Sequence, residues 1–129
     1  MVFHKKPILK FIFRLQLFIA SGLCIYFSNQ DIAFMGLINN LDKFFHLVAF
    51  FIYGLSLQYF LVTFKINKQK IIMLTIWIGF LFALSDEIHQ NFVDGRNCDI
   101  VDLLFDWVGI SISIFFNKYI FLIWAKINL

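Results

Sequence analysis

The sequence is poor in charge and in cysteine. Of its 129 residues, 15% are charged, whereas soluble chains carry about 25%, so a water-soluble enzyme and a disordered chain are both excluded. Cys24 lies within an apolar stretch and Cys98 in a polar loop, and two such cysteines do not form a disulfide framework. The basic residues are not interleaved with aromatic residues on a polar face, which argues against nucleic acid as a partner.

Apolar residues dominate instead. Hydrophobic types make up 61% of the chain, and the mean hydropathy is +0.83. A helix of about 20 apolar residues crosses the hydrocarbon core of a bilayer, which is about 30 Å thick. The sequence therefore predicts an all-α protein: a single membrane domain over residues 1–129, in which four transmembrane helices form a bundle. The expected spans are residues 8–27, 44–64, 71–90 and 102–122. We expect the apolar segment Ala33–Ile38, between the first two spans, to lie on the membrane surface as a lid.

The charged residues predict how these spans are oriented. With both termini in the cytoplasm, nine of the eleven lysines and arginines lie on the cytoplasmic side and all eight acidic residues on the outer side. The two basic residues of the outer side are then Lys43 and Arg96. Because positively charged loops stay in the cytoplasm, we expect both termini to be cytoplasmic.

Three polar segments meet at the extracytoplasmic end of this predicted bundle. The third apolar run is short, so Asp86 and Glu87 must lie at the membrane boundary, and Asp102 and Asp106 must enter the fourth span. Ionisable residues are costly in such positions and usually mark a site. We therefore expect a polar pocket open to the outer leaflet, built from Asp42, Lys43, His46, Asp86, Glu87, His89, Gln90, Arg96, Asp99, Asp102 and Asp106.

The order and spacing of these residues resemble the VanZ-like family of small bacterial membrane proteins. The shared motifs are Asp-Lys-x-x-His at 42–46, Asp-Glu-x-His-Gln-x-Phe at 86–92 and Gly-Arg-x-x-Asp-x-x-Asp at 95–102, with Gly109 beyond them. Asp94 stands where the family usually has proline, and Asp106 where it usually has asparagine. The family is named for a protein linked to teicoplanin resistance, so the resemblance implies the bacterial cytoplasmic membrane as the location and the cell envelope as the setting.

The basic side chains of the pocket allow two interpretations. Arg96 offers a planar fork of donors for phosphate, and Lys43 adds a point charge. In the first interpretation they bind the head group of an anionic lipid, such as a polyprenyl phosphate or a cell-wall precursor, with Asp42 and Gln90 as further contacts. In the second, Arg96 forms a structural salt bridge with a nearby carboxylate.

Proton transfer and metal binding are also open. His46 and His89 are candidates for proton transfer, because free histidine titrates near neutral pH. In this interpretation, Asp86, Glu87 and Asp102 orient the histidines or bind a cation. Carboxylates suit Mg²⁺ or Ca²⁺, and histidines suit Zn²⁺. The sequence has no His-Glu-x-x-His motif, and it does not decide between a metal site and a hydrogen-bonded network.

Two hypotheses about function follow. In the first, the protein recognises a lipid-linked anionic molecule at the outer face of the membrane, with modification of that molecule left open. In the second, it is a non-catalytic membrane scaffold or binding protein whose polar residues fix how the helices pack. The sequence itself specifies no cofactor and no oligomeric state.

Overall fold

The computed structural model of the chain describes residues 5–30 and 41–128 and, within them, the side chains of residues 7–30 and 41–126. Five helices occupy these ranges: α1 (Lys5–Ser28), α2 (Leu41–Val62), α3 (Lys68–Gln90), α4 (Ile100–Phe115) and α5 (Asn117–Asn128). The predicted all-α fold is confirmed. The segment Ala33–Ile38, expected to form a lid, lies outside the described residues.

The helices have the lengths that membrane spans require. The helices Pro7–Ser28, α2 and α3 are each long and apolar enough to cross a bilayer. With its 16 residues, α4 reaches only about 24 Å at a rise of about 1.5 Å per residue. It passes the same test together with α5, and the two helices meet at an angle of 46°. The chain is therefore a multi-pass membrane protein with three spans, or four if the bent pair is one span.

The bend between α4 and α5 lies beside a buried polar group. Asn117, the first residue of α5, is 1% exposed, and its Nδ2 donates to Oε1 of Gln58 on α2 over 2.9 Å. The Nε2 of Gln58 in turn donates to Oγ of Ser113 over 3.1 Å. Polar groups in hydrocarbon must find partners inside the protein. These bonds therefore anchor both sides of the bend to α2.

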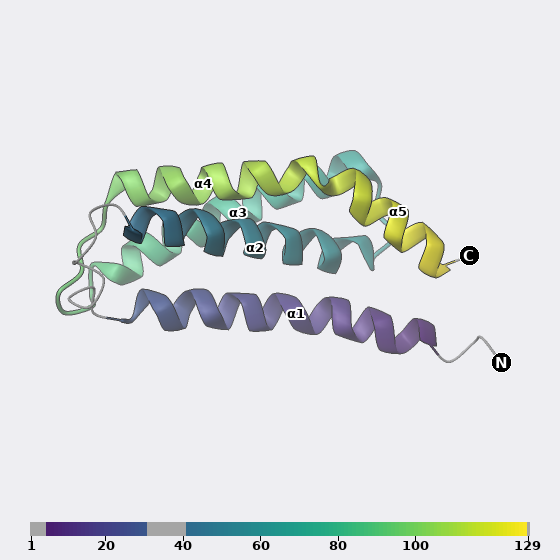
Figure 1. Ribbon diagram of the computed structural model, residues 1–129, viewed down its shortest axis with the longest axis horizontal. Coiled ribbons are helices and arrows are strands. Elements are labelled where there is room, and N and C mark those ends of the chain that lie inside the picture. Colours follow the sequence, from purple (N-terminus) through teal and green to yellow (C-terminus); the bar gives the residue numbers. More distant parts are fainter. Residues whose placement is uncertain (1–4, 31–40, 129) are drawn as a thin grey trace.

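The α2 helix is the centre of the bundle. It packs against each of the other four helices, and most extensively against α4. Gly109 of α4 makes the close approach possible, because a Cβ at this position would collide with the backbone of α2 at Leu47 and Phe51. Figure 1 shows α1 to α4 running side by side, with the beginning of α1 and the end of α5 at the same end of the bundle.

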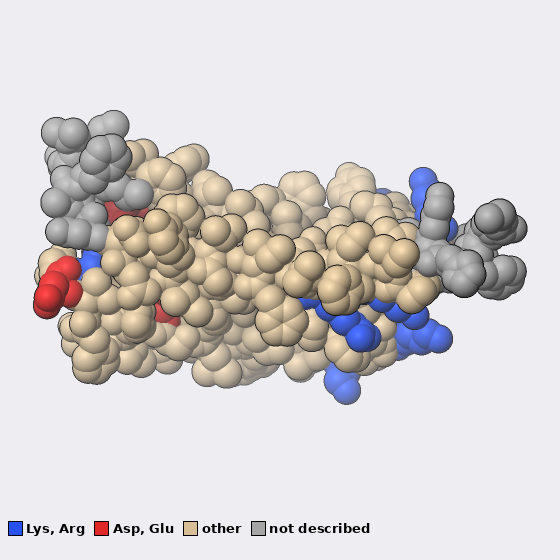
Figure 2. Space-filling view, turned by 90° about the horizontal axis from the view of Figure 1, so that it is seen from below, with Lys and Arg blue, Asp and Glu red and all other residues tan. Residues whose placement is uncertain are grey.

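Charge is separated along the bundle. We call the end where α1 begins and α5 ends the basic end; its basic residues with described side chains are Lys10, Arg14, Lys65, Lys68, Lys70, Lys118 and Lys126. The opposite end, where α1 and α3 end and α2 and α4 begin, is the acidic end. Figure 2 shows blue side chains gathered at the first end and red ones at the second, with an uncharged band between them. Large apolar side chains such as Phe18, Trp77 and Phe115 are exposed along this band, as lipid contact requires.

Candidate functional site

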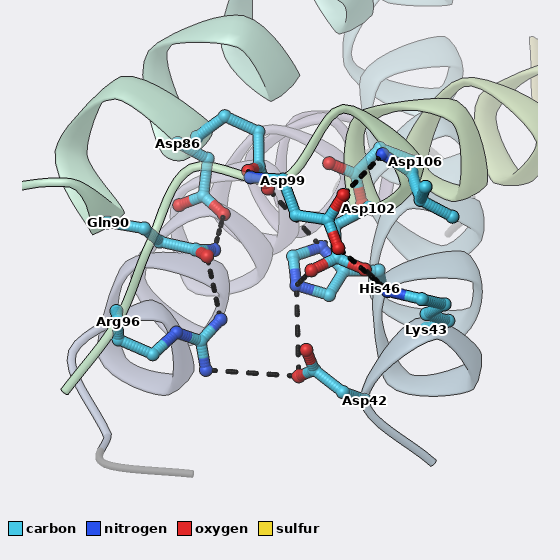
Figure 3. A network of polar contacts seen from close by, with 11 residues as sticks. Asp42, Lys43, His46, Asp86, Gln90, Arg96, Asp99, Asp102 and Asp106 are labelled. Carbon is cyan, nitrogen blue, oxygen red and sulfur yellow. Dashed lines mark hydrogen bonds and ion pairs between the residues drawn. The ribbon is translucent and has the colours of Figure 1, made fainter. Parts of the chain in front are cut away.

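A network of polar side chains fills the acidic end of the bundle (Figure 3). It joins residues from α2, α3, α4 and the turn between α3 and α4. We call this network the polar cluster; its members are Asp42, Lys43, His46, Asp86, Glu87, Gln90, Arg96, Asp99, Asp102 and Asp106.

His46 lies in the middle of the polar cluster. It follows Asp42 by one helical turn, so both side chains project from the same face of α2. Its Nδ1 is 2.8 Å from Oδ1 of Asp106, a fully buried residue of α4. Its Nε2 is 4.0 Å from Oδ1 of Asp42 and 3.9 Å from Oδ2 of Asp102. The Oε1 of Glu87 on α3 lies 3.9 Å from Nδ1. Four carboxylates from three helices therefore surround one imidazole ring.

Lys43, which precedes His46 by three residues on α2, is also paired with carboxylates. Its Nζ lies 3.0 Å from Oδ2 of Asp99 and 2.8 Å from Oδ1 of Asp102. Asp99 also caps α4, because its side chain accepts the backbone N–H of Val101 over 2.8 Å. This N–H, followed by the contact with Lys43, lowers the pKa of Asp99 below its ordinary value. Lys43 thus stabilises the start of α4, and it does not line the cavity described below.

The end of α3 is joined to the following turn by a chain of hydrogen bonds. The Nε2 of Gln90 donates to Oδ2 of Asp86 over 3.2 Å, and its Oε1 accepts from Nη2 of Arg96 over 2.8 Å. The backbone N–H of Asp99 donates to Oε2 of Glu87 over 2.9 Å. Asp86, Glu87 and Gln90 are all buried, so α3 turns its polar residues inward at this end.

Gly95 allows Arg96 to point back into the bundle. Its φ of 80° lies in the left-handed region that glycine adopts without strain. Arg96 is consequently buried, and its Nη1 lies 3.8 Å from Oδ1 of Asp42. The Nε of Arg96 is buried and has no hydrogen-bond partner among the described residues. The guanidinium therefore keeps donors that the described part of the chain leaves unused.

A cavity of about 230 Å³ lies between α1 and α2 and ends at the polar cluster. Its polar end consists of Asp42, His46, Asp86, Gln90 and Arg96. The remaining wall is mainly apolar and is contributed by residues of α1 and α2, among them Ala20, Leu23, Phe27, Phe45, Ala49 and Ile52. An apolar cavity with a few converging polar groups is the usual form of a ligand site.

The structure brings together most, but not all, of the residues singled out in the sequence. Eight of the nine candidate catalytic and substrate-binding residues belong to the polar cluster, together with Asp99 and Asp106. His89 is apart from them: its side chain is exposed, and its Nε2 lies 3.1 Å from Oδ1 of Asn29. The two histidines therefore do not share a site.

The sequence does not predict that α1 forms part of the cavity wall. Residues 20–28 of α1 contain no charged side chain, and the only polar groups there that line the cavity are Cys24 and Ser28. Nothing in such a segment distinguishes a cavity wall from a surface facing lipid.

Two sets of side chains in the polar cluster have the geometry to hold a metal ion. Asp42, His46 and Asp102 form the first, and His46, Asp86 and Glu87 the second. Within each set, the candidate ligand atoms lie within 4.8 Å of one another. Only the second set is buried throughout, whereas the first includes the half-buried Asp42.

Comparison with known proteins identifies the family. Neither the curated proteins nor the solved structures contain a match to this chain. A family model described as VanZ/LLP1 matches residues 4–123, which include all of the polar cluster and nearly the whole chain. This match confirms the resemblance that the motifs indicated. The chain belongs to the VanZ/LLP1 family.

Proposed function

We propose that this membrane protein binds a lipid-linked, phosphate-bearing molecule in the cavity between α1 and α2. The observation that carries the proposal is the position of Arg96, whose buried guanidinium lies at the end of a cavity with apolar walls. A lipid with an anionic head group has the matching polarity: its phosphate would meet Arg96 while its hydrocarbon chain lies along Leu23, Phe27 and Ile52.

The hydrogen bonding of Arg96 supports this proposal. A guanidinium has five N–H donors in a planar fork that suits phosphate oxygens. One hydrogen bond to Gln90 is formed here, at 2.8 Å, and the contact with Asp42 at 3.8 Å is too long for a second. The Nε is buried without a partner among the described residues, so a phosphate oxygen that reached it would satisfy this donor. Gln90 holds the fork in place, because its amide is itself fixed by Asp86.

Charge separation supports an outward-facing site. All described basic residues except Lys43 and Arg96 lie toward the basic end, and the positive-inside rule places such an end in the cytoplasm. The acidic end, and with it the cavity, would then face the outer leaflet. A labelling experiment tests this: a single cysteine introduced at Asn97, with Cys24 and Cys98 replaced by serine, should react with an impermeant maleimide in intact cells, and a cysteine at Lys68 should not.

If the bound phosphate reacts, we expect His46 to transfer the proton. It lines the cavity and is oriented by Asp106, as a group that transfers protons must be. His89, which was an equal candidate in the sequence, lies outside the polar cluster. Membership of the family suggests the cell envelope as the setting, so we extend the proposal to tolerance of teicoplanin. If neither deletion nor overexpression changes teicoplanin sensitivity, this extension is wrong.

The contacts of Lys43 favour the second hypothesis, a non-catalytic scaffold. A lysine with two carboxylate partners stabilises the packing of α2 against α4. Of the two cationic side chains, only Arg96 then binds phosphate. Native mass spectrometry of protein released gently from its own membrane distinguishes the two hypotheses. We expect a phosphate-bearing lipid on the wild type, and at least about a tenfold loss of it in Arg96→Lys, because the planar fork is replaced by a point charge.

Arg14→Lys is the matched control. It changes the other arginine of the chain, which lies toward the basic end and donates to Thr63 over 3.0 Å. Lipid retention should be unaffected by this change. Bare protein in all three samples, or equal retention in all three, would favour the scaffold hypothesis over the ligand site.

A further inference from the structure

We propose that the polar cluster binds a divalent transition-metal cation, Zn²⁺ or Mn²⁺, between His46, Asp42 and Asp102. The ligand atoms are Nε2 of His46 and one oxygen of each carboxylate. This inference concerns the protein's own side chains and does not depend on the proposed lipid ligand.

The three ligand atoms have suitable spacing. The Nε2 of His46 is 4.0 Å from Oδ1 of Asp42 and 3.9 Å from Oδ2 of Asp102, and all three residues offer atoms within 4.8 Å of one another. An ion equidistant from the three atoms lies roughly 2.3–2.5 Å from each, so bonds of about 2.0–2.2 Å to Zn²⁺ need a contraction of a few tenths of an ångström. Distances of 3.9 and 4.0 Å are too long for hydrogen bonds, so this spacing is not explained by direct contact.

The imidazole is presented as a metal ligand. His46 is 8% exposed, and its one hydrogen bond joins Nδ1 to the carboxylate of Asp106 over 2.8 Å. In neutral histidine, donation from Nδ1–H leaves the lone pair on Nε2. That nitrogen has no hydrogen-bond partner among the described residues and is aimed between Asp42 and Asp102, as Figure 3 shows. A carboxylate bound to the far nitrogen of a ligating histidine is a common feature of metal sites.

One of the other two ligands, Asp102, is also held by a second residue. Lys43 donates to Oδ1 of Asp102 over 2.8 Å, and the other oxygen, Oδ2, faces His46. Arg96 lies 3.8 Å from Oδ1 of Asp42 on the side of the cavity, a distance too long for a hydrogen bond. Hydrogen bonds such as that from Lys43 orient ligands before the ion binds. The set therefore consists of two ligands that hydrogen bonds orient, His46 and Asp102, and of Asp42, which lies beside them on the cavity side.

The polar cluster has more acidic than basic side chains, which favours the binding of a cation. It contains six carboxylates, from Asp42, Asp86, Glu87, Asp99, Asp102 and Asp106, but only two permanently cationic side chains, Lys43 and Arg96. Buried carboxylates are strongly unfavourable unless they are paired or coordinate a metal. Two of their buried oxygens, Oε1 of Glu87 and Oδ2 of Asp106, have no hydrogen-bond partner among the described residues. A divalent ion beside His46 would offset much of this excess negative charge.

The donor set selects the kind of ion. One imidazole nitrogen with two carboxylates suits Zn²⁺ or Mn²⁺, whereas Ca²⁺ and Mg²⁺ prefer oxygen ligands alone. Asp42 and His46 both line the cavity, so the remaining coordination positions of the ion would open toward it. Three protein ligands and an open position are the arrangement of a site at which a further molecule binds the metal.

The test measures metal on the full-length protein in detergent. Protein purified with a chelator, then freed of it, is incubated with Zn²⁺, Mn²⁺, Ca²⁺ or Mg²⁺ and passed through a gel-filtration column, and bound metal is measured by mass spectrometry. We expect about one Zn²⁺ or Mn²⁺ per chain and little Ca²⁺ or Mg²⁺. Asp42→Asn and Asp102→Asn should each weaken Zn²⁺ binding by at least about tenfold. A folded wild type that retains neither Zn²⁺ nor Mn²⁺ would overturn the proposal.

Two controls locate the ion. Asp86→Asn changes the second set of candidate ligands and His89→Gln changes the exposed histidine, so both variants should bind Zn²⁺ as the wild type does. Loss of binding in Asp86→Asn with normal binding in Asp42→Asn would move the ion to the other set, and loss in His89→Gln would place it on the surface; either result contradicts this assignment. If Asp102→Asn does not fold, Asp42→Asn decides, because its side chain is 23% exposed and tolerates change.

This experiment is independent of the lipid experiment. No lipid is added, and Arg96→Lys should still bind Zn²⁺. Loss of lipid in Arg96→Lys without any metal binding in the wild type would therefore contradict the metal site alone. Metal binding by protein that never retains lipid would contradict the proposed function alone.

Discussion

His46 of α2 and Asp106 of α4 face each other inside the bundle, with 2.8 Å between Nδ1 and Oδ1. Both residues are buried, and they join the two helices that pack most extensively. The resemblance described in the sequence implies asparagine at position 106 in the family. An asparagine side chain also offers an oxygen that accepts from Nδ1–H, so the orientation of the ring survives this difference, whereas the charge beside it does not.

The first prediction concerns this contact. Asp106→Asn keeps an acceptor for His46 and should change the free energy of unfolding by no more than about 1 kcal/mol. Asp106→Leu leaves Nδ1 buried without an acceptor and should cost about 1–3 kcal/mol. Unfolding by SDS titration in mixed micelles measures both. Equal stability of the two variants would mean that the hydrogen bond does not hold α2 and α4 together.

The second prediction concerns the close approach of these helices. In Gly109→Ala, the added Cβ would meet the carbonyl oxygen of Leu47 and the amide nitrogen of Phe51. These are backbone atoms, so the helices must separate, and we expect a loss of about 1–3 kcal/mol in the same titration. Gly22→Ala is the control, because a Cβ at this position of α1 meets no described atom within 4 Å. A Gly109→Ala variant as stable as Gly22→Ala would contradict the packing described here.

The helices and the residues of the polar cluster follow directly from the sequence. Apolar runs of sufficient length must be helical in lipid, and their order brings residues 42–46, 86–90 and 96–106 to one end. The four-residue step from Asp42 to His46 places both on one face. The family motifs indicated the same residues, and the family match confirms the resemblance.

Other features depend on how the helices are rotated about their axes. His89 and Gln90 are neighbours in sequence, yet Gln90 is buried and His89 exposed, because only Gln90 points into the polar cluster. The periodicity of apolar residues does not predict the rotation of a helix about its axis when the helix is apolar on most sides. The wall that α1 contributes to the cavity is unpredictable for the same reason. Likewise, Lys43 and Arg96 look equivalent in the sequence, but only Arg96 reaches the cavity.

The third prediction is a dependence of stability on pH. The pKa of Asp99 is lowered by the N–H of Val101 and by Lys43. A carboxylate with a lowered pKa stabilises the fold above its pKa in the unfolded chain, about 3.9, and this contribution disappears as the pH falls through the folded pKa. Asp99→Asn keeps a capping side chain but loses the charge. It should therefore be less stable than the wild type at pH 7 and equally stable well below pH 3.9.

The size of this effect is limited by exposure, since the Asp99 side chain is 42% exposed. Exposed ion pairs contribute about 0–1 kcal/mol, so a small difference at pH 7 is expected. Asp94→Asn is the control: Asp94 is exposed in the same turn and forms no ion pair with the described residues. Thermal unfolding in detergent at several pH values measures all three proteins. A difference between Asp99→Asn and the wild type that persists at low pH would rule out the ion pair as its cause.

The fourth prediction separates the cavity from the polar cluster. Ala49 lines the apolar wall, and Ala49→Leu adds three carbon atoms to a space of about 230 Å³, which a lipid chain could then no longer occupy. We expect the lipid retained in native mass spectrometry to fall several-fold while the protein remains folded, because filling an apolar cavity adds contacts instead of removing them. Ala125→Leu, an exposed position of α5 near the basic end, should leave lipid retention unchanged. Undiminished retention in Ala49→Leu would show that the bound lipid lies on the outer surface of the bundle, and that Arg96 receives no hydrocarbon chain through this cavity.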